Sequence, residues 1–252
     1  SLTSALRRIP RPLTSKGLRM NSTASREILW NVSSTANVVA LYGLLALTLL
    51  VMATGVYRHY EFVQSGTRDP QPLTPWWRRF AELADWGLMQ EGTLRERGPG
   101  FIHTLMYLGM LVLLFTTTMV LIDHDFGIPI YRGRFYLAVT VLSDLFGVAL
   151  LLGVLAALHR RYIARDPRLH TRWTDATALW VLALLVVQGY LLEGLRIHVT
   201  EDPWRFYSPV GLLVAKFFWG TSPATATTLH FSVWWFHTLT VYACFALFPY
   251  SK

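Results

Sequence analysis

The sequence predicts an all-α integral membrane protein, a bundle of five transmembrane helices with one or two interfacial helices. The 252-residue chain is 53% hydrophobic and only 15% charged, whereas a soluble domain carries about 25% charged residues. Its apolar residues occur in blocks of about 20, the length that crosses a hydrocarbon layer of about 30 Å as a helix. This composition excludes a soluble enzyme folded around a single core.

Five segments have the required length, and each is bounded by charged residues or by Pro or Gly. The predicted spans cover residues 36–57, 101–122, 135–158, 174–194 and 227–248. They form one membrane domain over residues 26–252, which follows a basic tail of residues 1–25. Residues 1–26 hold six basic residues and no acid, which is typical of a solvated tail, of an organellar transit peptide or of sequence upstream of a start at Met20.

Two segments outside the spans are predicted to be helices that lie at the membrane surface. In 74–88, Pro75 suits the first helical position, and aromatic and aliphatic side chains recur on one face of the helix. A second short helix is expected over 208–219, where a Ser-Pro pair precedes an apolar stretch. Neither segment implies chemistry by itself.

The distribution of Lys and Arg predicts the orientation of the bundle. The segments 58–100 and 159–173 hold six and five of these residues, whereas 123–134 and 195–226 hold two and three. By the positive-inside rule, the first two loops lie in the cytoplasm, with the N-terminus outside and the C-terminus inside an inner membrane, cytoplasmic or organellar. The net charge of +8 is therefore explained without a nucleic-acid partner.

The histidines carry the strongest indication of chemistry. His103 and His237 lie within predicted spans, and His230 shares the helical face of His237 because seven residues are close to two turns. Imidazoles from facing helices are a common way for a membrane bundle to hold the iron of a b-type haem. In the alternative, each His forms a hydrogen bond to a neighbouring helix and binds no cofactor. The single Cys, Cys244, excludes a thiolate iron–sulfur or zinc site built by this chain alone.

Several short stretches resemble a known family. The sequence at 98–103, 234–237 and 248–252 resembles the gamma subunit of respiratory nitrate reductase, and 25–31, 132–137 and 192–197 resemble more closely the related membrane domain of heterodisulfide-reductase-type iron–sulfur oxidoreductases. The resemblance covers about residues 25–252 and is most specific around His237. It implies a membrane cytochrome b subunit in the respiratory chain that transfers electrons between the quinone pool and a cytoplasmic iron–sulfur subunit or domain.

The resemblance also implies a ligand pattern. The family has two His on span two and two on span five, and His103 and His237 match the first of each pair. The second positions fall near Leu113, which is not a His, and near 255, beyond Lys252. His237 would then face span two near Met110 or Leu113, and Met110 is either a weak axial ligand of the haem iron or a packing residue.

His103 and His237 are not expected to share one iron, because their depths along the spans differ by about 13 Å at about 1.5 Å per residue. One haem b is expected, and a second is left open. His230 is a further candidate ligand, for a haem on the outer side, with His124 or His198 opposite it.

The family places a quinone site after the loop that joins spans two and three. Arg132 or Arg134 occupies that place and is a candidate donor to a quinone carbonyl, although an interfacial Arg commonly extends to lipid headgroups. Asp144, inside span three, is either a participant in proton release from quinol or a hydrogen-bond partner of Ser143 or of a neighbouring helix.

The expected function is an electron-transfer subunit of a quinone-linked oxidoreductase complex, in contact with other respiratory-complex subunits and with lipids. One alternative is a haemless anchor for such a complex. Another is a small proton-coupled transporter that uses Asp144, Glu193 and the His, against which stands the lack of an internal repeat.

Overall fold

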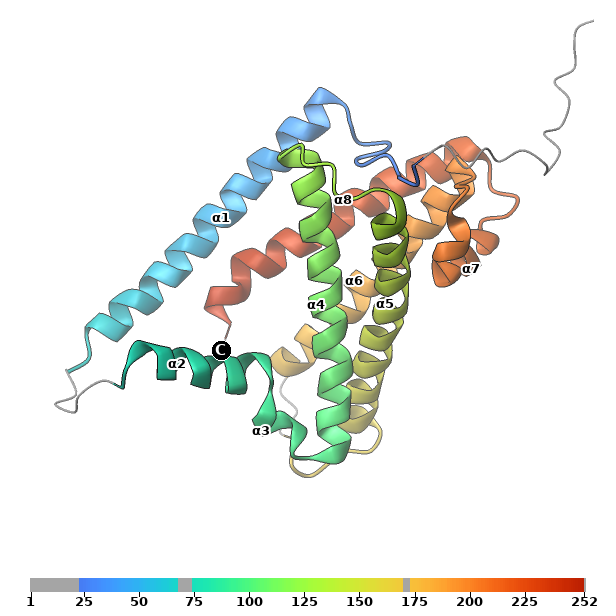
Figure 1. Ribbon diagram of the computed structural model, residues 1–252. Coiled ribbons are helices and arrows are strands. Elements are labelled where there is room, and N and C mark those ends of the chain that lie inside the picture. Colours follow the sequence, from blue (N-terminus) through green and yellow to red (C-terminus); the bar gives the residue numbers. More distant parts are fainter. Residues whose placement is uncertain (1–22, 68–73, 170–172, 252) are drawn as a thin grey trace, which may run out of the picture.

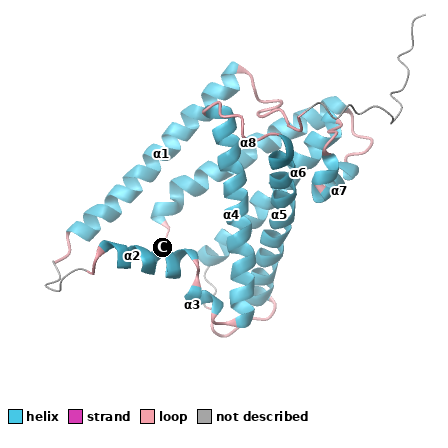
Figure 2. Ribbon diagram, in the orientation of Figure 1, coloured by secondary structure: helices cyan, strands magenta, loops and turns pink. Residues whose placement is uncertain are grey.

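The computed structural model describes residues 23–67, 74–169 and 173–251, and every regular element in these ranges is a helix (Figures 1 and 2). Five helices are long and apolar enough to cross a membrane. They are α1 (Thr35–Gln64), α4 (Arg97–Asp125), α5 (Gly133–Tyr162), α6 (Trp173–Thr200) and α8 (Pro223–Leu247). The prediction of five membrane-spanning helices is confirmed.

Each of the five helices extends beyond its predicted span into polar sequence. Helix α4 begins at Arg97 rather than at 101, so His103 lies in its second turn. The side chains of Ser34 and Ser222 cap the first turns of α1 and α8, where they accept hydrogen bonds from backbone N–H groups. Hydropathy marks only the part of a helix that lies in hydrocarbon, whereas backbone hydrogen bonds continue to the capping residue.

Short helices stand at both of the places expected from the sequence. Helix α2 (Trp76–Leu83) continues as the π-helical turn η1 (Ala84–Leu88) and is followed by α3 (Glu91–Leu94), and Figure 1 shows α2 running across the end of the bundle. At the other end, η2 (Arg205–Tyr207) precedes α7 (Pro209–Phe217). The turn η3 (Phe248–Tyr250) follows α8 and lies at the same end as α2, where the carbonyl oxygen of Pro249 meets His59 of α1 (Figure 1). That α2 and α7 lie at the membrane surface stays a prediction. The two ends are called the α2 end and the α7 end below.

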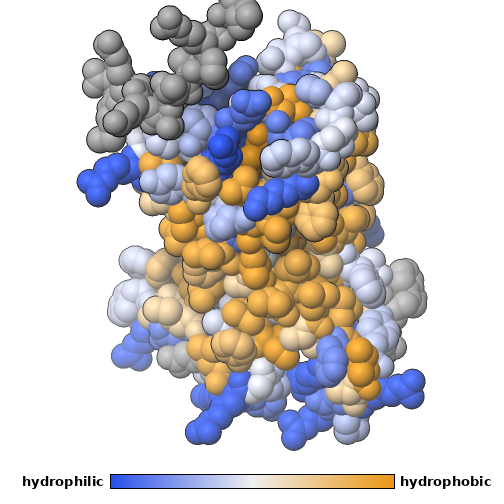
Figure 3. Space-filling model, turned by 90° about the vertical axis from the view of Figure 1, so that its right-hand side faces the viewer, coloured by the Kyte–Doolittle hydropathy of each residue, from blue (hydrophilic) through white to orange (hydrophobic). Residues whose placement is uncertain are grey.

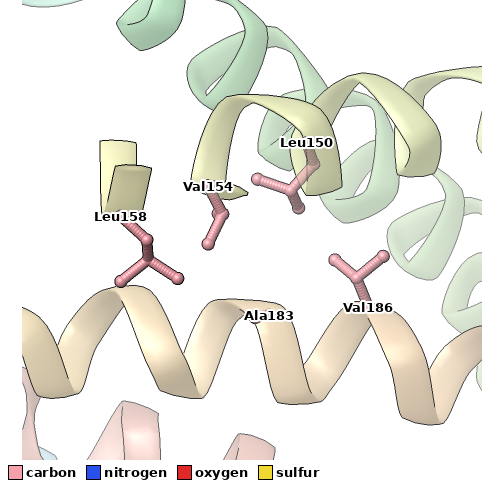
Figure 4. Close-up of a cluster of buried hydrophobic side chains, with 5 residues drawn as sticks. All are labelled: Leu150, Val154, Leu158, Ala183 and Val186. Atoms are coloured by element: carbon pink, nitrogen blue, oxygen red, sulfur yellow. The ribbon is translucent and has the colours of Figure 1, made fainter. Parts of the chain in front are cut away.

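Helices α4, α5 and α6 form the packed centre of the bundle, α8 packs on α6, and α1 packs mainly on α8 (Figure 1). One core cluster joins Leu150, Val154 and Leu158 of α5 to Ala183 and Val186 of α6 (Figure 4). Helices α4 and α5 approach closely because small residues stand at their contact.

Gly109 on α4 illustrates that approach. A Cβ atom at Gly109 would lie 2.6 Å from the Cβ of Leu150, so no larger residue fits there without a shift of the helices. Sequence periodicity along α4 does not reveal this contact, because it depends on α5.

Apolar side chains are exposed along the long helices, among them Leu50, Leu114 and Leu152. The face drawn in Figure 3 has a broad hydrophobic band with hydrophilic side chains above and below it. In water such a surface would be an aggregation hazard, whereas in a bilayer the same side chains face lipid. Together with the five apolar helices, this band identifies an integral membrane protein.

The described segment before α1 folds back over the α7 end of the bundle. Ala24 and Val32 are buried, and the carbonyl oxygen of Ala24 accepts a hydrogen bond of 2.6 Å from the N–H of Gly133. This segment places Arg26 against α6. Residues 1–22, which make up most of the predicted basic tail, lie outside the described residues.

Candidate cofactor-binding cavity

A cavity of about 450 Å³ lies inside the bundle, between α4 on one side and α8 on the other, with walls from α5 and α6. The part between α4 and α8 is mainly apolar. Its lining there comprises Met110, Leu113, Leu114, Thr116 and Thr117 of α4 and His237, Val241 and Phe245 of α8. The structure therefore brings His237 to the same cavity as Met110 and Leu113, the two positions that the resemblance places opposite it.

The orientation of His237 is set by Gln188 on α6. The Nδ1 atom of His237 lies 3.3 Å from Oε1 of Gln188. An amide oxygen can only accept, so Nδ1 carries the proton and donates it. The lone pair of the imidazole then resides on Nε2, in a ring that lines the cavity.

Gln188 itself is a costly residue at this place. Its side chain is 3% exposed, and its Nε2 atom has no hydrogen-bond partner within the described part of the chain. An interhelical hydrogen bond in a membrane contributes about 0.6 kcal/mol on average, whereas an unsatisfied buried polar group costs about 1–3 kcal/mol. The Gln188–His237 pair is therefore not explained by the stability of the α6–α8 contact. Sequence analysis did not select Gln188, although an amide within an apolar span is itself a signal.

Two glycines shape the cavity next to this pair. A Cβ atom at Gly189 would meet no atom within 4 Å, so Gly189 opens directly onto free space. At Gly147 a Cβ atom would lie 2.6 Å from the hydroxyl of Tyr190. That hydroxyl donates a hydrogen bond of 2.5 Å to the carbonyl oxygen of Asp144. The cavity thus has a tightly packed wall at α5 and an open one at α6.

The facing wall on α4 offers few groups that are free to bind a ligand. The hydroxyls of Thr116 and Thr117 donate to backbone carbonyls of their own helix. Met110 has a thioether sulfur that can bind a metal, whereas Leu113, at the position where the family has a His, has no atom that can. Met110 is therefore the soft donor on this wall.

His103 and His230 lie apart from the cavity lining. The Nε2 atom of His103 is 3.1 Å from Oε1 of Gln90, and its ring stacks at 6.2 Å from that of Tyr107 near the α2 end. His230 is buried near the α7 end, where its Nδ1 lies 3.4 Å from the side-chain nitrogen of Asn31. The structure does not bring these two residues to His237.

The partners considered for His230 make other contacts. His198 Nε2 lies 3.1 Å from the carbonyl oxygen of Thr221. His124 Nε2 lies 4.0 Å from a carboxylate oxygen of Asp125, in a partly exposed position. A haem held between His230 and either residue stays a prediction.

Charged residues line the α7 end of the cavity. Glu193 accepts hydrogen bonds of 2.8 and 3.1 Å from Arg196 and one of 3.1 Å from the hydroxyl of Ser208. Arg26 lies 3.5 Å from the same carboxylate, and Arg196 also pairs with Asp202 at 2.7 Å. Buried charges are tolerated when they are paired and hydrogen-bonded in this way.

Arg26 and Tyr131 are the functional candidates that sequence reasoning missed. Both line the cavity, and the Arg26 guanidinium lies 5.6 Å from the centre of the Tyr131 ring. Arg132, one of the two arginines that the sequence offered for the quinone site, is more than half exposed and lies 4.0 Å from Asp123. Arg134 is also exposed, and neither residue is part of the cavity lining.

Asp144 caps a helix. Its two carboxylate oxygens accept hydrogen bonds of 2.9 and 3.1 Å from the backbone N–H groups of Val210 and Gly211, in the first turn of α7. A carboxylate at this place satisfies otherwise unpaired donors and complements the helix dipole. Of the two roles considered, the structure supplies the bond to a neighbouring helix.

Comparison with known proteins identifies relatives among membrane oxidoreductases. The chain is 27% identical over 175 residues to the EtfAB:quinone oxidoreductase of Syntrophomonas wolfei subsp. wolfei; the match covers 65% of this chain but only 24% of the relative's length. It is 25% identical over 243 residues to one subunit of the dihydromethanophenazine:CoB–CoM heterodisulfide reductase of Methanosarcina thermophila, a match that covers 88% of this chain and 84% of the relative. The same figures hold for the corresponding subunit of Methanosarcina acetivorans.

No protein-family model and no solved structure matches the chain. The chain is therefore similar to subunits of quinone- and methanophenazine-linked oxidoreductases, and its five apolar helices are long enough to cross a membrane. The expected likeness to the gamma subunit of nitrate reductase stays a prediction.

Proposed function

We propose that this chain is a b-type haem subunit that transfers electrons between the quinone pool and an iron–sulfur oxidoreductase partner. The proposal rests mainly on the position of His237. Its side chain lines a cavity between two transmembrane helices, and its Nδ1 is hydrogen-bonded to Gln188. The names of the relatives supply the class of reaction, since one is a quinone oxidoreductase and the others are subunits of a heterodisulfide reductase.

The residues of the cavity fit a haem. Its volume of about 450 Å³ falls in the range of about 300–1,000 Å³ that is usual for cofactor pockets. Gly189 leaves room beside the ring of His237, and imidazole nitrogen is a suitable ligand for iron. Met110 would be the ligand from the facing wall. A bound haem supplies one-electron transfer at the iron.

The chain's own residues hold and insulate the cofactor. His237 would provide the nitrogen that holds the iron, while leucine and valine side chains would exclude water and lower the local dielectric constant. One haem is proposed for this cavity. A second haem would use His103, whose nearest polar partner is Gln90.

Arg26 is the residue we assign to quinone binding, in place of Arg132 and Arg134. Its guanidinium donates hydrogen bonds and lines the α7 end of the same cavity. The neighbouring Glu193 neutralises it at 3.5 Å and leaves donors free for a carbonyl oxygen.

The proposed orientation keeps the N-terminus outside and the C-terminus inside the cell or organelle. The α2 end, with its basic loops, then faces the cytoplasm and the iron–sulfur partner. Residues 1–252 hold one Cys, so the iron–sulfur clusters lie in a partner subunit or in a further domain. The quinone end faces outward.

Haem content of the purified chain tests the proposal. The wild type should hold one haem b per chain by pyridine haemochrome assay, and His237→Ala should lose it. His59→Ala is the matched control, because His59 bonds the carbonyl oxygen of Pro249 at the end of the bundle. A wild type without haem would instead support the haemless anchor, and full haem content in His237→Ala would exclude His237 as the ligand.

A further inference from the structure

The proposed function gives no role to Gln188, although its polar side chain is buried beside His237. Its amide lies within a membrane-spanning helix, is almost fully buried, and makes one side-chain hydrogen bond among the described residues, to His237. The donor group of the same amide has no partner within the described ranges. A leucine would fill the same space on α6 without leaving a polar group unpaired.

The bond has a defined direction. Oxygen Oε1 of Gln188 accepts and Nδ1–H of His237 donates at 3.3 Å, which fixes the ring tautomer as well as its rotation about the Cβ–Cγ bond. Helix α6 packs along α8, so the acceptor is held on a rigid element rather than on a loop. The remaining nitrogen, Nε2, is then the one whose lone pair is free, in a side chain that lines the cavity.

We infer that Gln188 is a positioning residue that sets the reduction potential of the cavity's metal centre through His237. The inference rests on the proposed function. An acceptor on Nδ1–H makes the opposite nitrogen a stronger electron donor to iron, which favours the oxidised state and lowers the potential. An amide oxygen does this less strongly than a carboxylate and more strongly than a hydrocarbon.

A graded set of variants separates this role from packing. Gln188→Leu removes the acceptor at similar volume and should shift the midpoint potential of the haem upward. Gln188→Glu keeps an acceptor of higher charge and should shift it downward. The order of potentials is therefore Leu above wild type above Glu, which a merely structural role does not produce.

The pair of Gln90 and His103 provides a matched control, because it also joins an amide to an imidazole. Gln90 lies 3.1 Å from Nε2 of His103, away from the cavity. Gln90→Leu should leave the potential of the cavity haem unchanged. Size-exclusion elution and circular dichroism of all variants establish that each is folded.

The experiment is a redox titration of the purified chain with optical detection, together with EPR spectra of the oxidised haem, whose g-values report the orientation of the axial ring. If the wild type binds haem and Gln188→Leu shows the same midpoint potential and g-values, the role of Gln188 is overturned while the proposed function stands. Loss of haem from both the Leu and the Glu variants would also overturn it, because Glu keeps the acceptor. Loss from Gln188→Leu with retention in Gln188→Glu supports it. A wild type without haem would remove the proposed function and this role together.

Discussion

Filling the cavity at Gly189 should displace the cofactor without unfolding the protein. A Cβ atom at Gly189 meets nothing within 4 Å, so a larger side chain enters the free space rather than a neighbouring helix. Benzene fits in a cavity of about 150 Å³, so the ring of Gly189→Phe would take about a third of the available 450 Å³. We expect haem content to fall at least about tenfold, which is about 1.4 kcal/mol of binding free energy.

Gly189→Ala is the matched variant for this prediction. It should keep its haem and gain about 1 kcal/mol of stability, since Ala is the better helix former. Haem per chain is measured by pyridine haemochrome assay, and stability by thermal unfolding in detergent. Full haem content in a folded Gly189→Phe protein would refute the assignment of this cavity to the cofactor.

Three further predictions concern packing and the quinone end. Asp144→Ala should destabilise the protein by about 1–2 kcal/mol in thermal unfolding, because the first turn of α7 loses its cap; an unchanged unfolding temperature would contradict this role. Gly109→Ala should cost about 1–3 kcal/mol through overpacking, whereas Gly43→Ala, with nothing within 4 Å of its Cβ, should be neutral or stabilising; equal effects would contradict the close approach of α4 and α5. Arg26→Gln should raise the apparent KM for quinol in a haem-reduction assay and Arg132→Gln should not; the reverse result would return the quinone site to Arg132.

The spans were predictable because hydropathy is local. Four of the five predicted segments lie inside an observed α-helix, and the fifth, 227–248, passes the end of α8 by one residue. The other differences at the ends come from backbone bonds that continue into polar sequence. His237 was selected for the same reason: an ionisable side chain within an apolar run is costly wherever the helix packs. The placement of Met110 near it followed from the resemblance, and the structure lines one cavity with both.

The charged end of the cavity was not predictable from spacing. Arg26 and Glu193 are 167 residues apart in the chain and meet only because the segment before α1 folds over the bundle. Arg132 and Arg134 were candidates because the resemblance places a basic residue after the loop between spans two and three. The chain turns there so that Tyr131 is buried and Arg132 lies near Asp123. The role of Gln188 could not be predicted either, because its side-chain hydrogen bond to His237 forms only when α8 packs beside α6.

The central claim is that a haem in this cavity exchanges electrons with quinone. The most direct measurement is the difference spectrum of the purified, oxidised chain after addition of a quinol and then of dithionite. We expect a b-type alpha band that appears after addition of quinol, and that appears more slowly in Arg26→Gln. A spectrum without an alpha band under either reductant would contradict it.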